Sequence, residues 1–206
     1  MGIVEELASS LGQRGEGPNF RVAESLVDEP DAAAVSDLVD TLVSGPARLA
    51  GDAAAALQKL AELDPSQVAP HCAAIAGMLV SKNNRLVWGA ATILHSVASA
   101  LPGAVKPHVR QLMRAVASGS VITQDHGVGA LAATGDRAGL DFALAHLRTC
   151  GWHYVPLRAE RVAPFVGDRW PEFRDAVESR LPEQAPTGAR RIRRLLAGIE
   201  SAGERP

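Results

Sequence analysis

Aromatic residues are scarce in this chain: three Trp, one Tyr and four Phe make up 4% of its 206 residues. β-Sheets are enriched in aromatic and β-branched side chains, so this composition disfavours a β-rich fold. Alanine is abundant instead, and its small side chain suits closely packed helices. We therefore expect an all-α protein.

Cysteine and long apolar segments are also lacking. The two cysteines, Cys72 and Cys150, lie far apart and form no disulfide framework, which is typical of a reducing compartment. No window approaches the roughly 18 consecutive apolar residues of a membrane-spanning helix. The N-terminal segment has neither the basic flank nor the apolar run of a secretory signal. We expect a cytoplasmic protein with no membrane span.

Charge of either sign is present, but it is unevenly distributed along a chain whose formal net charge is only −2. Residues 1–64 contain 12 Asp and Glu against 4 Lys and Arg, whereas the remainder contains 11 against 17. An acidic front and a basic rear can orient a charged partner or favour head-to-tail contacts. The alternative is that these charges only solvate the outer faces of helices.

A repeat of 37 residues organises the middle of the sequence. One shift by this period superimposes the following identical residues: Ala53, Ala54, Leu57, Ala61, Pro65, Val68, Pro70, His71 and Ser81 on Ala90, Ala91, Leu94, Ala98, Pro102, Val105, Pro107, His108 and Ser118. A second shift takes Leu94 to Leu131, and a backward shift takes Arg85 to Arg48. Such periods mark arrays of one supersecondary unit that buries its apolar face by stacking on its neighbours.

Apolar residues at helical spacing, separated by Gly, Pro and capping residues, predict the helices. We expect helices at 4–11, 19–29, 31–43, 47–63, 67–81, 85–100, 105–117, 121–133, 138–147, 157–165, 171–181 and 188–201. Asn19 and Ser66 are the predicted N-caps, and Asp31 is expected to start the third helix. We expect helix 121–133 to be the least stable of the array, because each of its interior glycines costs about 1 kcal/mol relative to Ala.

Each repeat places an early Pro in one helix, a small polar turn, and an Arg at the start of the next helix. The pattern Arg-x-x-x-x-Ala-Ala-x-x-Leu begins at Arg48 and at Arg85, while a third copy carries Ile122 in place of Arg. This arrangement resembles HEAT or armadillo repeats. The resemblance implies a right-handed α-solenoid of five or six helical pairs, a fold that hosts many unrelated functions.

We divide this single domain into three segments. Residues 1–46 form an irregular N-terminal unit, 47–136 contain the regular repeats, and 137–206 contain divergent units and a cap. Five of the eight aromatic residues fall between Trp152 and Phe173. Large side chains at the end of an Ala-rich array suit an aromatic-rich cap that seals an open core.

In a stacked array, the second helix of each unit lines the concave face. The positions expected on this face are Arg48, Asp52, Arg85, Trp88, Thr92, His95, Asp125 and His126. Trp88 stands out because the apolar stripe of its helix points away from it. A Trp on a concave helical surface, close to Asp125, His126 and His95, is typical of a binding hot spot for a protein or peptide. The alternative, that Trp88 fills the space left by Gly51 in the neighbouring unit, stays open.

These observations predict a non-enzymatic protein-interaction scaffold with no catalytic residue, metal or cofactor, and they do not predict an oligomeric state. One alternative is alkylated-DNA recognition, since 88–95 faintly resembles a helix of the helical-repeat alkylpurine DNA glycosylases. Those enzymes use an Asp one turn after the Trp, where this chain has Thr92, and a basic cleft for phosphates. We therefore do not expect a nucleic-acid partner. A second alternative is a HEAT-repeat helper of the chromophore-lyase kind, which depends on fold analogy alone.

Two further features have both a functional and a structural interpretation. His71-Cys72 and the Cys150–His153 pair offer ligand types that zinc accepts, but no spacing rule joins them, and Cys72 lies on an apolar stripe. The helix at 188–201 is basic on one side and apolar on the other. It can contact acidic protein, phosphate or anionic lipid, or it can cap the array with a solvated Arg face.

Overall fold

A computed structural model describes residues 2–203 of the chain, with side chains to Ser201. The described residues form helices and no strand, which confirms the prediction of an all-α chain. The α-helices are α1 (Gly17–Asp28), α2 (Ala32–Ser44), α3 (Ala47–Leu63), α4 (Pro65–Val68), α5 (Cys72–Gly77), α6 (Asn84–Ala100), α7 (Pro102–Val105), α8 (Val109–Ser118), α9 (Val121–Ala133), α10 (Arg137–Thr149), α11 (Val155–Val162), α12 (Trp170–Glu178) and α13 (Pro186–Gly203). Several short 3₁₀ helices accompany them. One, η1 (Ile3–Glu6), precedes α1, and three lie within the repeats: η2 (Ala69–His71), η3 (Met78–Val80) and η4 (Lys106–His108). Residues 1 and 204–206, which belong to the predicted first and third segments, lie outside the described residues.

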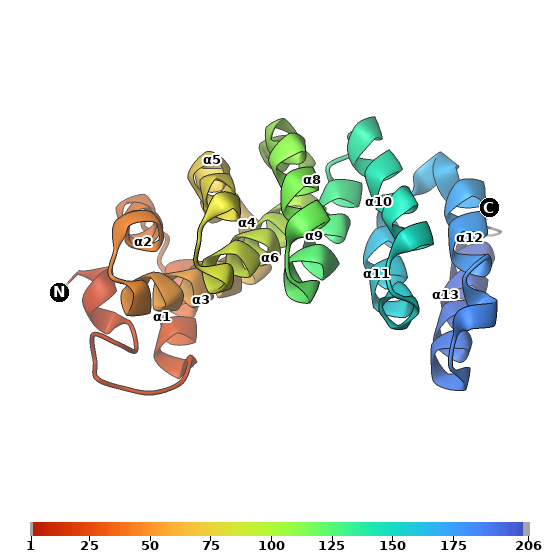
Figure 1. Cartoon of the computed structure of the whole chain (residues 1–206). Helices are drawn as coiled ribbons and strands as arrows, with labels where there is room; N and C mark the ends of the chain where they lie inside the picture. Colours follow the sequence, from red (N-terminus) through yellow and green to blue (C-terminus); the bar gives the residue numbers. More distant parts are fainter. Residues whose placement is uncertain (1, 204–206) are drawn as a thin grey trace.

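The helices lie in two rows along an elongated molecule, with the chain termini at opposite ends (Figure 1). The upper row consists of α2, α5, α8, α10 and α12; the lower row consists of α3, α6, α9, α11 and α13. Consecutive members of the lower row pack on one another, and α3, α6, α9 and α11 also contact a helix of the upper row. The core lies between the rows, and helices of both contribute to it. None of the helices in residues 2–203 is long and apolar enough to cross a membrane.

The 37-residue period is visible in the boundaries of the elements. α3 and α6 each contain 17 residues, and α6 begins and ends 37 positions after α3. The same offset relates α4 to α7, and α6 to the start of α9. Leu57, Leu94 and Leu131, which the repeat makes equivalent, all have no exposed surface. The repeated apolar positions therefore occupy equivalent places in the core.

The first helix differs from its prediction. Residues 4–11 do not form an α-helix, since η1 is followed by turns. Asn19 does not cap α1 but lies inside it, fully buried, and its Oδ1 accepts a hydrogen bond of 2.9 Å from the amide of Ala8. An Asn that satisfies a buried backbone donor from another segment serves tertiary packing rather than helix initiation.

Proline also changes the helices expected at 67–81 and 105–117. Pro70 lies in η2 between α4 and α5, and Pro107 lies in η4 between α7 and α8. Because Pro lacks an amide hydrogen and clashes with the preceding turn, each predicted helix is split and kinked at its Pro. The cap differs as well: the carboxylate of Asp64, not the hydroxyl of Ser66, accepts the amide hydrogen bond at the start of α4.

The glycines of α9 permit close packing. A Cβ atom at Gly127 would lie 2.3 Å from Cγ2 of Val116 on α8, and one at Gly129 would lie 2.4 Å from Nε2 of His95 on α6. Every residue of α9 from Gly127 to Ala133 is buried. The expectation that α9 is the least stable helix therefore left out the gain from tertiary packing. The small side chains of α9 allow it to pack closely against α6 and α8.

The aromatic residues near the C-terminus take different environments. Phe173 has no exposed surface, and its ring centroid lies 5.6 Å from that of Trp170. Trp152, by contrast, is 45% exposed. Arg180 connects the segment after α12 to the end of α10. Its guanidinium donates hydrogen bonds to the carbonyl oxygens of Leu147 and Cys150, at 2.9 and 2.8 Å. These contacts satisfy the free carbonyls at a helix C-terminus.

Candidate functional site

The eight predicted site residues all lie on helices of the lower row, and six of them form two separate groups. Arg48 and Asp52 lie on α3, and Asp125 and His126 lie on α9. The four others, Arg85, Trp88, Thr92 and His95, lie on α6 between these helices. One group lines a hollow near the N-terminus and consists of Arg48, Asp52 and Arg85. The other group lies where α9 packs against α6 and α11 and consists of His95, Asp125 and His126.

The hollow near the N-terminus has a volume of about 520 Å³ and lies between α3, α6 and the loop 12–16. Asp52 holds the N-terminal segment in place there. Its Oδ2 accepts a hydrogen bond of 2.8 Å from the amide of Ser9, and its Oδ1 accepts one of 3.2 Å from Nδ2 of Asn19. The carboxylate of Asp52 therefore organises the wall of the hollow.

The side chain of Arg85 crosses α3 at Gly51, where an added Cβ atom would lie 3.4 Å from the guanidinium carbon. Nη2 of Arg85 lies 3.7 Å from Oε1 of Glu16, and both side chains are about half exposed. One of the two interpretations left open for Trp88 was that it fills the space at Gly51, but the side chain that lies against Gly51 is Arg85. Glycine thus serves the contact between neighbouring helices of the lower row.

Trp88 is only partly exposed and lies one helical turn after Arg85. Thr92, one turn further, is 4% exposed, and its hydroxyl donates a hydrogen bond of 2.9 Å to the carbonyl oxygen of Trp88. Hydrogen bonding back to the preceding turn is common for Thr within helices. Thr92 is therefore not displayed for contact with a partner, and we remove it from the expected surface.

His95 and His126 meet across α6 and α9, with their ring centroids 5.6 Å apart in an edge-on arrangement. Burial, reinforced by the charge of Arg161, lowers the pKa of His95 to about 4. Burial, Arg161 and His95 together lower the pKa of His126 to about 3. Both imidazoles are consequently neutral at pH 7, because uptake of a proton would add charge in a poorly hydrated place beside a cation.

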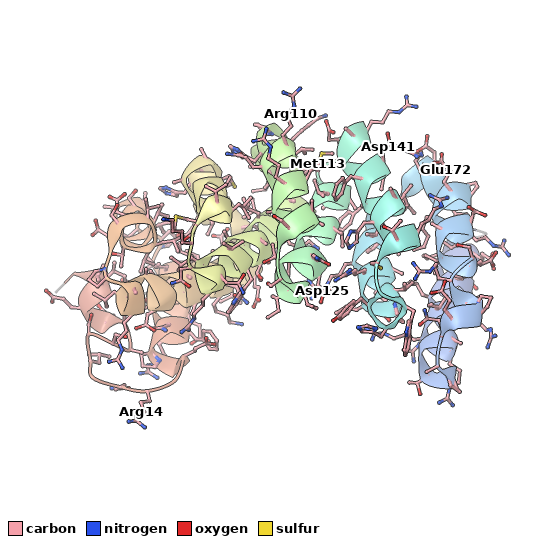
Figure 2. The ribbon with its side chains drawn as sticks, in the orientation of Figure 1. Arg14, Arg110, Met113, Asp125, Asp141 and Glu172 are labelled. Carbon is pink, nitrogen blue, oxygen red and sulfur yellow. The ribbon has the colours of Figure 1, made fainter. Side chains whose placement is uncertain are left out.

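Asp125 lies at the end of α9 that faces α11 (Figure 2). Its Oδ1 accepts a hydrogen bond of 2.7 Å from Nε of Arg158, whose side chain has no exposed surface. Nη1 of Arg158 lies 2.8 Å from Nε2 of His146, and its guanidinium carbon lies 4.7 Å from the ring centroid of Tyr154. Asp125 is 7% exposed, so it serves this internal network and is not available to a partner.

Sequence reasoning missed Arg158, Arg161 and His146. All three lie beyond the repeats, where no periodic pattern fixed which helix faces they occupy, and an isolated Arg is normally predicted to be exposed. Burial lowers the pKa of the Arg161 guanidinium, an effect that Asp125 partly offsets. Nη2 of Arg158 and Nδ1 of His126 are buried without a hydrogen-bond partner among the described residues.

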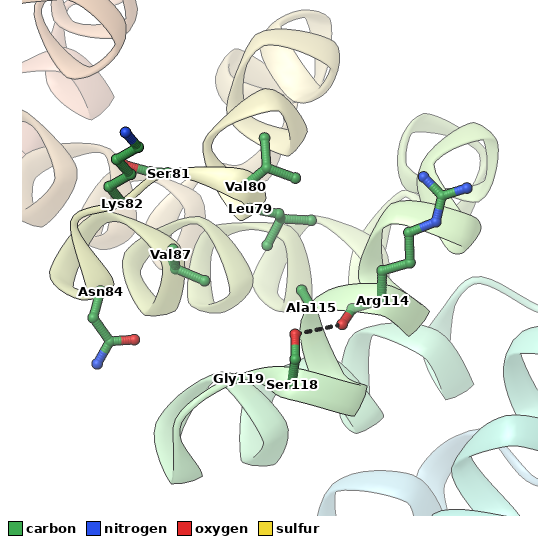
Figure 3. A pocket seen from close by; sticks show the side chains of 10 residues that line it. All are labelled: Leu79, Val80, Ser81, Lys82, Asn84, Val87, Arg114, Ala115, Ser118 and Gly119. Atoms are coloured by element: carbon green, nitrogen blue, oxygen red, sulfur yellow. Dashed lines mark hydrogen bonds between the residues drawn. The ribbon is translucent and has the colours of Figure 1, made fainter.

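A groove of about 360 Å³ lies between η3 and the start of α6 on one side and α8 on the other (Figure 3). Its apolar part comprises Leu79, Val80, Val87 and Ala115. Lys82 and Arg114 line it as well, and the hydroxyl of Ser118 donates to the carbonyl oxygen of Arg114 at 3.2 Å. Val80 is 79% exposed at the edge of this groove.

Both cysteines are buried with free thiols. Burial raises the pKa of the Cys72 thiol to about 11, so the thiol stays protonated at neutral pH and behaves as a small apolar side chain. Within residues 2–203, no three His, Cys, Asp or Glu side chains are grouped as metal ligands would be.

Comparison with known proteins shows similarity of fold alone. No family model and no curated protein matches the sequence. The structure is similar to the crystal structure of one engineered protein, with a TM-score of 0.57 and 20% identity over 98% of each chain. It is also similar to that of a second engineered protein, with a TM-score of 0.61 and 18% identity over 98% of this chain and 100% of the other. Neither of these matches indicates a ligand or an activity.

Proposed function

We propose that this chain is a right-handed α-solenoid of the HEAT or armadillo type that serves as a non-enzymatic scaffold for a protein or peptide partner. The repeat of helix boundaries every 37 residues and the packing of the lower row support the solenoid. The three segments 1–46, 47–136 and 137–206 are its irregular first unit, its regular repeats and its aromatic-rich cap. Two free cysteines, Cys72 and Cys150, support a cytoplasmic location.

One observation carries the functional proposal: the lower row presents a partly exposed Trp88 between two regions of polar side chains. On one side of it along α6 lies the polar hollow with Arg48 and Arg85, and on the other lie His95 and His126. A Trp contributes a large apolar area and few rotatable bonds, and such residues dominate the energetics of protein interfaces. The partner contacts Trp88 and four side chains around it, namely Arg48, Arg85, His95 and His126. Asp52, Thr92 and Asp125 support this surface from within.

The alternative of alkylated-DNA recognition receives less support from the same geometry. A glycosylase needs a carboxylate beside the displaced sugar, but Thr92 occupies the position one turn after Trp88. Asp125 is buried in its ion pair with Arg158. A binding assay with duplex DNA at low salt tests this alternative, because a phosphate-binding cleft retains DNA under those conditions.

The proposal is tested by affinity capture from the native host with the wild-type chain, Trp88→Ala and the matched control Trp152→Ala. Trp152 is 45% exposed near the C-terminal end, so its removal alters surface area away from α6. We expect Trp88→Ala to lose the proteins that the wild type and Trp152→Ala both retain. Circular dichroism must show equal helicity for all three. Retention of the same proteins by Trp88→Ala would overturn the proposal.

A further inference from the structure

The hollow near the N-terminus is unusually rich in arginine. Arg14, Arg48 and Arg85 come from three different segments, namely the loop 12–16, α3 and α6, and all three line it. Arg14 and Arg48 are exposed, and the side chain of Arg85 is 54% exposed. Arg14 lies at the tip of the loop, below the ribbon (Figure 2). These side chains are accessible to a molecule that enters the hollow.

The two acidic residues of the hollow, Glu16 and Asp52, offset only part of the charge of these three arginines, which leaves a net charge of +1 (3 − 2). Asp52 accepts hydrogen bonds from the amide of Ser9 and from Asn19, and it forms no ion pair within the described part of the chain. Glu16 lies 3.7 Å from Arg85, and because both side chains are about half exposed, such a pair contributes little. Arg14 and Arg48 lack an ion-pair partner among residues 2–203. The hollow therefore holds excess positive charge within an acidic half of the sequence.

The side chain of Arg85 already packs against α3 in this structure. Its guanidinium packs over Gly51, where a side chain would restrict it, and it lies close to the start of α3 that carries Arg48. An arginine that is already oriented loses less conformational freedom on binding than a free one. The planar guanidinium also offers paired N–H donors that match the two oxygens of a carboxylate.

We infer that this hollow binds the carboxylate groups of an acidic segment of the protein partner. Arg48 and Arg85 contact the carboxylates, and Arg14 closes over them from the loop. The inference rests on the proposed function, since it names the chemistry of the partner that contacts Trp88. Arg85 and Trp88 are one helical turn apart, so an acidic segment in the hollow places a following apolar side chain against Trp88. Charge then sets the orientation of the partner, and Trp88 supplies apolar contact.

The experiment measures binding of a fluorescent hexaglutamate peptide by anisotropy at low ionic strength, where exposed charges are least screened. The test variant is Arg48→Glu with Arg85→Glu. The matched control is Arg110→Glu with Arg137→Glu, which changes the net charge equally at two exposed positions that line neither hollow nor groove. A conservative variant, Arg48→Lys with Arg85→Lys, keeps the charge but removes the paired donors.

We expect the test variant to bind hexaglutamate at least about tenfold more weakly than the wild type, and the control to differ by no more than about twofold. The lysine variant should lie between them. Equal weakening in the test variant and the control would show that only net charge matters, and would overturn the inference, as would the absence of binding to the wild type. Failure of the proposed function gives a different result from these two outcomes. In that case the capture experiment retains the same proteins with Trp88→Ala as with the wild type.

Discussion

Nε of Arg158 on α11 donates a hydrogen bond of 2.7 Å to Oδ1 of Asp125 on α9, and the arginine side chain is completely buried. His146 and Tyr154 enclose the same guanidinium from α10 and the turn before α11. This ion pair joins the regular repeats to the C-terminal helices, whose sequence does not follow the repeat. It is therefore the main polar connection between the two parts of the array.

The first prediction concerns this ion pair. Asp125→Ala leaves the Arg158 guanidinium buried and unpaired, which should lower the free energy of unfolding by about 3–5 kcal/mol. Urea denaturation followed by circular dichroism measures the loss. The control is Asp175→Ala, because Asp175 pairs with Arg148 at the surface and is 73% exposed. A loss no larger than that of the control would show that the pair does not connect the two parts of the array.

The second prediction concerns pH. Burial and the neighbouring Arg158 lower the pKa of His146 to about 4, and those of His95 and His126 are lowered to about 4 and 3. The unfolded chain takes up these protons near pH 6.5, whereas the folded chain does so only near pH 4 or below. The unfolded state thus binds more protons in this window, so the free energy of unfolding is highest above pH 6.5 and falls as the pH decreases towards 4.

Urea denaturation at a series of pH values between 7.5 and 5 measures this slope, since few carboxyl groups titrate there. His146→Gln should make the slope shallower, because glutamine keeps an acceptor for Arg158 and does not titrate. A variant with the wild-type slope would indicate that His146 does not contribute to the acid sensitivity.

The third prediction concerns the close packing at α9. Gly129→Ala raises intrinsic helix propensity, but its Cβ atom would lie 2.4 Å from Nε2 of His95. Overpacking of this kind costs about 1–3 kcal/mol, which equals or exceeds the propensity gain of roughly 1 kcal/mol. We therefore expect a lower midpoint of thermal unfolding. Gly198→Ala on α13 is the control, since nothing lies within 4 Å of its added Cβ atom, and its midpoint should rise. A rise in both variants would contradict the packing described for α9.

The fourth prediction concerns Asn19. Asn19→Ala removes the acceptor for the buried amide of Ala8 and a donor to Asp52. An unsatisfied buried donor costs about 1–3 kcal/mol. The loss should be local, so hydrogen exchange of the amide of Ala8 should accelerate while that of α9 stays unchanged. Equal acceleration throughout the chain would instead indicate that the N-terminal segment is required for the whole fold.

The extent to which the sequence predicted the structure differs between its parts. Helices α3 and α9 begin and end where the pattern placed them, because repeated apolar positions mark their extent, with Pro46 before α3 and the capping side chain of Ser120 before α9. The split helices around Pro70 and Pro107 were predicted as continuous, since a Pro near a helix start is tolerated in many helices and the position of the kink depends on tertiary packing.

The candidate site was predictable as a set of positions but not as a set of roles. The repeat placed Thr92 and Asp125 on the helices expected at 85–100 and 121–133, and the structure has them on α6 and α9, although both are buried. It gave no indication that Asp125 pairs with Arg158, which lies 33 residues later in a part of the chain without the repeat. Side-chain partners of this kind depend on how α11 approaches α9, and no local pattern encodes that approach.

Hydrogen exchange of the chain with and without its captured partner tests the central claim most directly, because it reports which surface the partner covers. We expect slower exchange at the loop 12–16 and in α6 from Arg85 to His95 when the partner is bound. Slower exchange confined to α8 and α10 of the upper row, with α6 unchanged, would contradict it.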